Sequence, residues 1–304
     1  MITNNTIGVV VNCDTRPGYL DNETYCGKIG GMGANGARSA DFIISNVYNK
    51  REFFRGYDIE LTLYIDLHTA ITKDVWANIK IMVDRGDIDN LVIAKHTDIY
   101  KGRRIRQWQD INYINALTMS KSKYIAHFDA DTSAYRKNDS DIIDRFKNIV
   151  DSGEYKYISY PSYHSPNEGD VPGQNAYPTP DQTDKPDYLW ASTRFFFCKS
   201  ESIKHDEFIN LLDDRQWIAA HNGRPHRYPN VTEQILGFTA GANKVMFAPK
   251  ELEEYMIFCW HTYHSGTIDK LRYLTYEEIY KYIMEHAVAF VARVMLMRLG
   301  YDKT

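Results

Sequence analysis

A pair of aspartates, Asp129 and Asp131, is the motif in this sequence with the clearest chemistry. They follow an apolar run, residues 124–128, that has the composition of a buried strand. In an extended segment, side chains two residues apart point the same way, so both carboxylates would project from one edge. Such hard anionic ligands suit Mn²⁺ or Mg²⁺, which keep open positions for waters and for the oxygens of a diphosphate. A bare pair of this kind is often only a solvated turn, but the strand ahead of it favours a metal site.

A second candidate is a pair of histidines, His261 and His264, in an aromatic segment of the C-terminal region. A neutral imidazole is a good ligand for Mn²⁺ and a poorer one for Mg²⁺. Histidines in aromatic surroundings are also often half-buried packing residues. The pair therefore predicts a further metal ligand without deciding which ring provides it.

A third candidate is Glu233, at the start of a segment, residues 231–238, that is predicted to be helical. The helix dipole stabilises an acid in this position, and that is the ordinary explanation for it. A carboxylate can also take a proton from a hydroxyl group, so Glu233 is a candidate catalytic residue.

The first half of the chain alternates short apolar runs with longer amphipathic ones, which is typical of a mostly parallel sheet flanked by helices. The predicted strands are residues 7–12, 60–66, 91–95 and 124–128, and the predicted helices are 37–54, 73–85 and 105–119. Polar segments follow the strands at residues 13–16, 66–69, 96–98 and 129–132. Ligands of open α/β sheets bind outside the carboxyl ends of the strands, so these segments should surround one site.

The second half has fewer regular patterns. Residues 159–186 are rich in Pro, Tyr, Gly, Asn and Asp without periodicity, which is typical of a lid or binding loop. After this loop we predict a strand at 190–199, helices at 206–220 and 231–238, and a strand at 245–248. Helical spacing over residues 276–299, followed by Gly300, predicts a long C-terminal helix.

The composition argues against several classes of protein. The net charge of -4 and the pI of about 6.2 provide no field that would attract nucleic acid, and the basic cluster at residues 101–106 is too short to change this. The 4 cysteines are widely spread, so reduced thiols are expected rather than a disulfide framework or a zinc site. With no signal peptide or membrane-spanning apolar stretch recognised in the sequence, we expect a cytoplasmic enzyme of microbial or viral origin.

The strand, the aspartate pair and the strand after it resemble the GT-A nucleotide-sugar glycosyltransferases, and the similar organisation covers residues 7–270. The resemblance implies an α/β fold of GT-A type, with a Rossmann-like nucleotide-binding half at residues 1–132. An acceptor-binding half would follow at 133–274, and residues 275–304 would form a helix packed on this single domain. It also implies that Asp129 contacts the donor's ribose or the metal and that Asp131 ligates the metal.

The same resemblance implies roles for residues outside the aspartate pair. Four residues at strand ends would contact the base and ribose of the donor: Asp14, Thr15, Arg16 and Asp66. Arg106, at the start of a predicted helix, could reach a phosphate as a fixed cation. His264, Gly266 and Lys270 match the residues that complete the metal and diphosphate site in this fold. Their spacing departs from the glycogenin-like pattern, so His261 remains a competing ligand.

The segment from Glu233 to Pro249, which ends in KVMFAP, resembles the corresponding segment of the ABO blood-group transferases. In many GT-A enzymes an acid at the start of this helix faces the anomeric carbon of the donor. By this resemblance Glu233 is either the base that deprotonates the acceptor or, in a retaining enzyme, the carboxylate that stabilises the oxocarbenium-like centre.

These observations predict a Mn²⁺- or Mg²⁺-dependent glycosyltransferase that moves a hexose or pentose from a nucleotide diphosphate sugar, UDP being favoured over GDP, to a hydroxyl of a glycan or other acceptor. Tyr163 in the Pro/Tyr-rich loop and Arg194 after it would shape the acceptor side.

Two other classes of protein stay open. Gly31, Gly33 and Gly36 fit the dinucleotide fingerprint of an NAD(P)-dependent oxidoreductase, although residues 13–30 separate them from the first predicted strand, where that motif requires a tight turn. The chain could also be a carbohydrate-binding protein with a decayed transferase fold.

Overall fold

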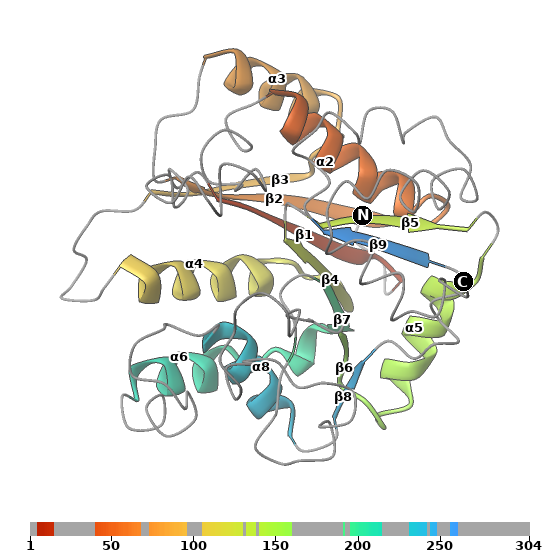
Figure 1. The fold of residues 1–304 in the computed structure, drawn as a ribbon, viewed down its shortest axis with the longest axis vertical. Helices are drawn as coiled ribbons and strands as arrows, with labels where there is room; N and C mark the ends of the chain where they lie inside the picture. The colour runs from red at the N-terminus through yellow and green to blue at the C-terminus, as the bar shows by residue number, and fades with distance from the viewer. Residues whose placement is uncertain are drawn as a thin grey trace, which may run out of the picture.

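The computed structural model describes residues 5–14, 40–67, 73–95, 105–129, 132–137, 140–159, 191, 195–214, 231–241, 244–247 and 256–260. Its central feature is a 7-stranded sheet (Figure 1). In spatial order the strands are β3 (Asn90–Lys95), β2 (Ile59–Leu67), β1 (Ile7–Asp14), β4 (Tyr124–Asp129), β7 (Phe195–Lys199), β6 (Tyr157–Ser159) and β8 (Val245–Phe247). A separate 2-stranded sheet pairs β5 (Thr132–Arg136) with β9 (Met256–Trp260).

Most strand pairs of the large sheet are parallel. β1 pairs in parallel with both β2 and β4, β2 with β3, and β6 with β8. Among the described strands of this sheet, only β7 runs antiparallel to both of its neighbours, β4 on one side and β6 on the other. The predicted α/β class with a mostly parallel sheet is therefore confirmed.

Helices cover both faces of this sheet (Figure 1). One core cluster packs the sheet against α2 (Ala40–Phe53), α3 (Lys73–Asp84) and α5 (Ile142–Asp151). The other packs it against α4 (Ile105–Met119), α6 (His205–Asp213) and α8 (Val231–Ala240). None of the described helices is long and apolar enough to cross a membrane.

The valine run in β1 explains why this strand lies inside the sheet and not at its edge. Val9 and Val11 belong to the core on the α2 side, Val10 belongs to the core on the α4 side, and all three are fully buried. A strand covered by helices on both faces needs continuous apolar residues rather than alternation. The interior position of β1 therefore agrees with its sequence.

The predicted helix at residues 206–220 does not continue through Asp214, and residues 215–220 lie outside the described residues. The structure ends α6 at Asp213, and Asp214 is extended, with its N–H bonded to the carbonyls of Asn210 and Leu211. Two consecutive aspartates are unfavourable at the negative end of the helix dipole, which is the physical reason for the early end. The predicted helix at 276–299 lies outside the described residues. The predicted loop at 159–186 also lies outside them, except for Ser159.

Several short elements were not among the predicted strands and helices. The most regular is α5, where Ile142, Ile143, Phe146 and Val150 are buried at helical spacing. It was detectable in principle, because its apolar residues form one face. β6 has only 3 residues and β9 only 5, which is too short for the same test.

Candidate functional site

The carboxyl ends of four parallel strands meet at one edge of the large sheet. Asn12 of β1 is in register with Asp129 of β4, and Asp14 is in register with Asp66 of β2. Leu67 is in register with Lys95 on β3. The predicted gathering of strand ends is confirmed for these residues, whereas residues 15–16, 68–69, 96–98 and 130–131 lie outside the described part of the chain.

The strand that carries Asp129 is held rigidly by the aromatic residues before it. His127 is fully buried, with its ring centroid 4.8 Å from that of Tyr113 on α4 and 5.2 Å from that of Phe196 on β7. On the opposite face, the ring of Phe128 packs against Phe195 of β7 at 5.0 Å. The backbone of β4 is therefore fixed from both faces up to the residue before Asp129.

The segment after the aspartate pair is joined to the C-terminal region by the β5–β9 ladder. The pairing is antiparallel, and Thr132 of β5 lies opposite Trp260 of β9. In sequence, Thr132 comes directly after Asp131 and Trp260 comes directly before His261. The last pair of the ladder is thus next in sequence to one candidate metal ligand on each side, Asp131 before Thr132 and His261 after Trp260.

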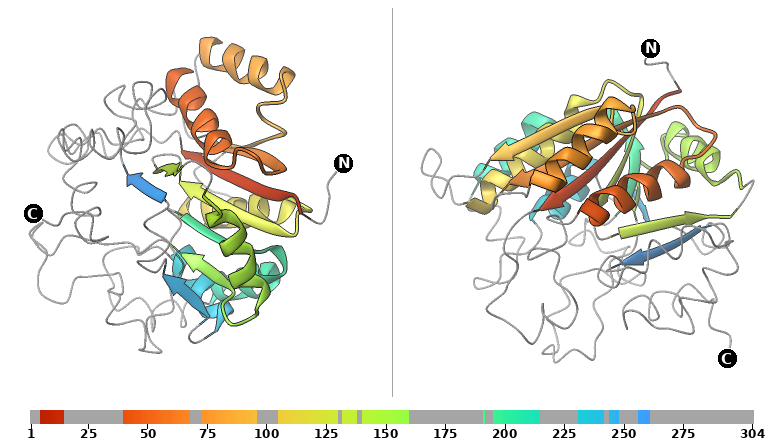
Figure 2. Two further views of the ribbon diagram at one scale, coloured as in Figure 1. Left: turned by 90° about the vertical axis from the view of Figure 1, so that its right-hand side faces the viewer. Right: turned by 90° about the horizontal axis from the view of Figure 1, so that it is seen from above.

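Helix α2 lies beside β5, as Figure 2 shows, and Asn49 joins the two elements. Its Nδ2 donates to the carbonyl of Ala134 at 3.0 Å, and its Oδ1 accepts from the N–H of Ala134 at 2.9 Å. The next residue, Lys50, is fully buried; its Nζ donates to the same Oδ1 at 3.3 Å and lies 5.2 Å from the ring centroid of Phe128.

Asn12 is a polar residue at the strand ends that the sequence analysis passed over. It interrupts the apolar run of β1, where it pairs in register with Tyr64 and Asp129. Its Oδ1 is buried and accepts no hydrogen bond from the part of the chain that the structure describes. An amide inside an otherwise apolar strand was the signal available in the sequence.

Glu233 lies in the first turn of α8, as the sequence indicated. Its backbone carbonyl accepts the N–H of Ala191 at 3.0 Å, and its side chain is only 2% exposed. The helix is fixed by Ile235 and Leu236, which are buried in the core on the α4 side. Glu233 is therefore an enclosed carboxylate on a helix with little freedom to move.

The structure describes the other candidate residues only in part. It describes only the backbone of Asp14, Asp66, Arg106 and Asp129. The remaining candidate residues lie outside the described residues: Thr15, Arg16, Asp131, Tyr163, Arg194, His261, His264 and Lys270. Gly31, Gly33 and Gly36 also lie outside. Among the side chains that are described, no group of three or more His, Cys, Asp or Glu residues could hold a metal ion.

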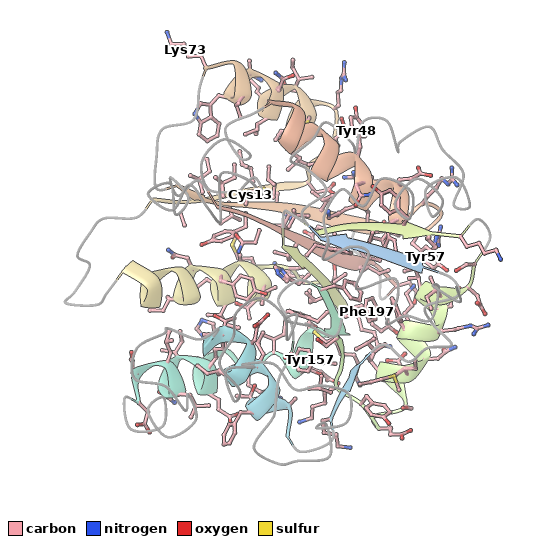
Figure 3. The ribbon with its side chains drawn as sticks, viewed as in Figure 1. Cys13, Tyr48, Tyr57, Lys73, Tyr157 and Phe197 are labelled. Carbon is pink, nitrogen blue, oxygen red and sulfur yellow. The ribbon has the colours of Figure 1, made fainter. Side chains whose placement is uncertain are left out.

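Among the described side chains, the titratable groups with shifted pKa values lie away from these strand ends. Burial raises the pKa of the Tyr157 hydroxyl and of the Cys198 thiol well above their usual values, and the two residues face each other across β6 and β7. Tyr157, which is labelled in Figure 3, donates to the carbonyl of Ser202 at 3.1 Å. Both groups stay neutral near pH 7 and act as core residues.

No protein-family model matches the sequence, and no curated protein matches it. Solved structures with partial similarity include the galactosyltransferase LgtC in complex with donor and acceptor sugar analogs, with a TM-score of 0.43 and 10% identity over 80% of this chain and 73% of its own. The mannosyltransferase Ktr4p from S. cerevisiae in complex with GDP has a TM-score of 0.42 and 11% identity over 83% and 70%. The mannosyltransferase PcManGT from Pyrobaculum calidifontis, in complex with GDP-Man and Mn²⁺, has 0.40 and 11% over 99% and 77%. Similarity this low says nothing about the chemistry of this chain.

Proposed function

We propose that this chain is a metal-dependent glycosyltransferase that moves a sugar from a nucleotide diphosphate sugar to a hydroxyl of a glycan or another acceptor. The observation that carries the proposal is the register of the β5–β9 ladder. The pair of Thr132 and Trp260 at its end supports a site shared by Asp131 and the histidine segment, since Asp131 comes directly before Thr132 and the two histidines follow Trp260 within four residues.

The side chains proposed as metal ligands fit a divalent cation. Asp129 and Asp131 offer hard carboxylate oxygens, and His264, or His261 in its place, offers an imidazole nitrogen. Such a mixed set favours Mn²⁺ over Mg²⁺, because Mg²⁺ prefers oxygen ligands alone. When bound, the cation supplies positive charge that neutralises the departing nucleotide diphosphate.

The ends of β1 and β2 form the donor side of the proposed site. Asp14 and Asp66 are neighbours in register, which supports a shared role in holding the nucleoside together with Thr15 and Arg16. Asn12 adds an amide oxygen at the same edge. Arg106 in the first turn of α4 and Lys270 provide cations for the diphosphate.

Glu233 is the proposed catalytic carboxylate. It takes the proton from the acceptor hydroxyl or stabilises the positive charge that develops at the anomeric carbon. Its burial supports a carboxylate that is kept from bulk water. In such an enclosed place the field of the carboxylate on a nearby cation is stronger than it would be in water. Tyr163 and Arg194 belong to the proposed acceptor side.

The experiment that tests the function is a screen of UDP- and GDP-sugars for slow hydrolysis of the donor with Mn²⁺ present and with the metal removed by EDTA. The proposal predicts release of the nucleoside diphosphate from at least one donor, dependent on Mn²⁺ and lost in Asp131→Asn. Asp84→Asn is the matched control, since Asp84 is an exposed acid that pairs only with Lys80 among the described residues. Stabilisation of the fold by NAD but not by UDP with Mn²⁺ would favour an oxidoreductase, and sugar binding without turnover would favour a binding protein.

A further inference from the structure

The segment with the aspartate pair is held by two adjacent residues of one helix. Asn49 bonds to Ala134, three residues after Asp131, and Lys50 lies over the ring of Phe128, directly before Asp129. α2 therefore contacts the chain on both sides of the pair. A shift of this helix relative to either contact would change the backbone between them.

The Asn49 amide bonds to the backbone of Ala134 in the way that a neighbouring strand would. The N–H and C=O of one residue in a strand point to the same side, and both of these groups on Ala134 bond to the Asn49 amide. They consequently point away from β9, and Ala134 and Phe258 form a non-hydrogen-bonded pair of that ladder. β5 is held from both edges, by β9 on one side and by the Asn49 side chain on the other.

The Asn49 side chain is itself held in place. It is 8% exposed, and its Oδ1 accepts from both Ala134 and Lys50. An asparagine amide offers one acceptor and one donor group in fixed geometry, so it can satisfy a backbone N–H and C=O together, which aspartate or alanine cannot do.

We propose that Asn49 is a positioning residue that sets the backbone of the aspartate pair for the metal and the diphosphate. This inference rests on the proposed function. The hydrogen bonds of a residue behind a metal ligand orient that ligand, and their removal typically costs about tenfold to a hundredfold in metal affinity. Loss of the Asn49 bonds should therefore weaken the metal site even when the fold survives.

The test compares N49A with N90A by titrating Mn²⁺ in the presence of UDP and following the free ion by electron paramagnetic resonance. Asn90 is a matched control, because its Nδ2 also bonds across elements, to Glu60 and Thr62, but at the start of β3, away from the carboxyl ends of the strands. We expect N49A to bind Mn²⁺ about tenfold more weakly than wild type and N90A to bind it within about twofold. Equal affinities of the two variants would overturn the inference.

A second variant covers the case in which N49A fails to fold. N49D keeps the acceptor for the N–H of Ala134 and loses the donor to its carbonyl, and N90D makes the same change at the control position. The added negative charge should attract Mn²⁺, so a weaker site in N49D reports altered geometry rather than altered charge. Affinity that rises or stays the same in N49D would count against a positioning role.

Hydrogen exchange of the wild-type chain gives a readout that needs no substitution. Binding of Mn²⁺ with UDP should slow exchange of the Ala134 amide more than that of Asp89, whose N–H bonds to Leu61 at the other end of the sheet. Equal slowing of both amides would contradict the inference. Wild-type protein that binds no Mn²⁺ with UDP would instead overturn the proposed function and this inference together.

Discussion

Thr132 of β5 lies opposite Trp260 of β9, although helices α6 and α8 both come between them in the sequence. This pair joins the segment that follows the two aspartates to the segment that precedes the two histidines. A metal site built from both segments needs such a connection, because ligands far apart in the sequence must be held at fixed distances from one ion.

The first prediction concerns the histidine that completes this site. Of His261→Ala and His264→Ala, one variant should lower the affinity for Mn²⁺ by more than about tenfold and the other should change it little, because one imidazole completes the carboxylate set. Isothermal titration with Mn²⁺ and UDP measures both. Each variant is the control for the other, and wild-type affinity in both would remove histidine from the site.

The second prediction concerns Glu233. Glu233→Gln should keep donor binding and lose transfer by about a hundredfold or more, since the amide has nearly the same shape but cannot accept a proton or carry charge. Transfer is measured with the donor identified by the hydrolysis screen. Glu207→Gln changes an exposed acid in the first turn of α6 and should leave transfer intact. Near-normal transfer by the Glu233 variant would exclude it from the mechanism.

The parallel part of the sheet was predictable because its signals are local. In β1, β2 and β4, buried residues face both core clusters, β3 is a shorter apolar run at the edge of the sheet, and α4 spans the predicted residues 105–119. The position of Asp129 at the end of β4 follows from the same pattern. Burial of continuous apolar residues leaves few other arrangements for such segments.

The supports of the candidate site were not predictable in this way. Asn49 acts through Ala134, 85 positions away, and a lone asparagine in a helix carries no local signal for that contact. The pairing of β5 with β9 likewise depends on which strands meet in space. Both features come from long-range contacts, which single-sequence patterns do not encode.

The third prediction concerns the stability of the core behind β4. Phe197, which is labelled in Figure 3, is fully buried. Its ring centroid lies 5.7 Å from that of Tyr124 and 5.5 Å from that of Phe146. Phe197→Ala should lower the free energy of unfolding by about 3–5 kcal/mol, the usual cost of removing a buried ring. Urea unfolding measures it. Phe238→Ala, at a side chain that is 37% exposed, should cost less than about 1 kcal/mol; equal losses would contradict the packing described.

The fourth prediction concerns pH and Asp151, the last residue of α5, which accepts a hydrogen bond from Tyr124 at the start of β4. Partial burial raises the pKa of Asp151, whereas hydrogen bonds from Tyr124 at 2.7 Å and Lys123 at 3.0 Å lower it. The lowering effects together are larger, so the pKa of Asp151 is below its usual value. A carboxyl with a lowered folded-state pKa stabilises the fold above its unfolded pKa and loses this effect as the pH falls through the folded value.

Asp151→Asn should therefore be less stable than wild type at pH 7, by less than about 1 kcal/mol because the group is partly exposed. The difference should shrink as the pH is lowered through the acidic range. Urea unfolding at a series of pH values measures this difference in stability. The affinity for Mn²⁺ should not change, since Asp151 contacts the start of β4 and Asp129 lies at its end. A difference that grows in acid would contradict the assigned direction of the pKa.

The central claim is that Asp129 and Asp131 hold a divalent cation against a nucleotide diphosphate. A crystal grown with Mn²⁺ and UDP or GDP tests it most directly, because manganese has a distinct anomalous signal. We expect a manganese peak with a carboxylate oxygen of Asp131 within about 2.2 Å, Asp129 beside it, and diphosphate oxygens on the open side. Ordered nucleotide elsewhere, or both carboxylates turned to bulk solvent without manganese, would contradict the claim.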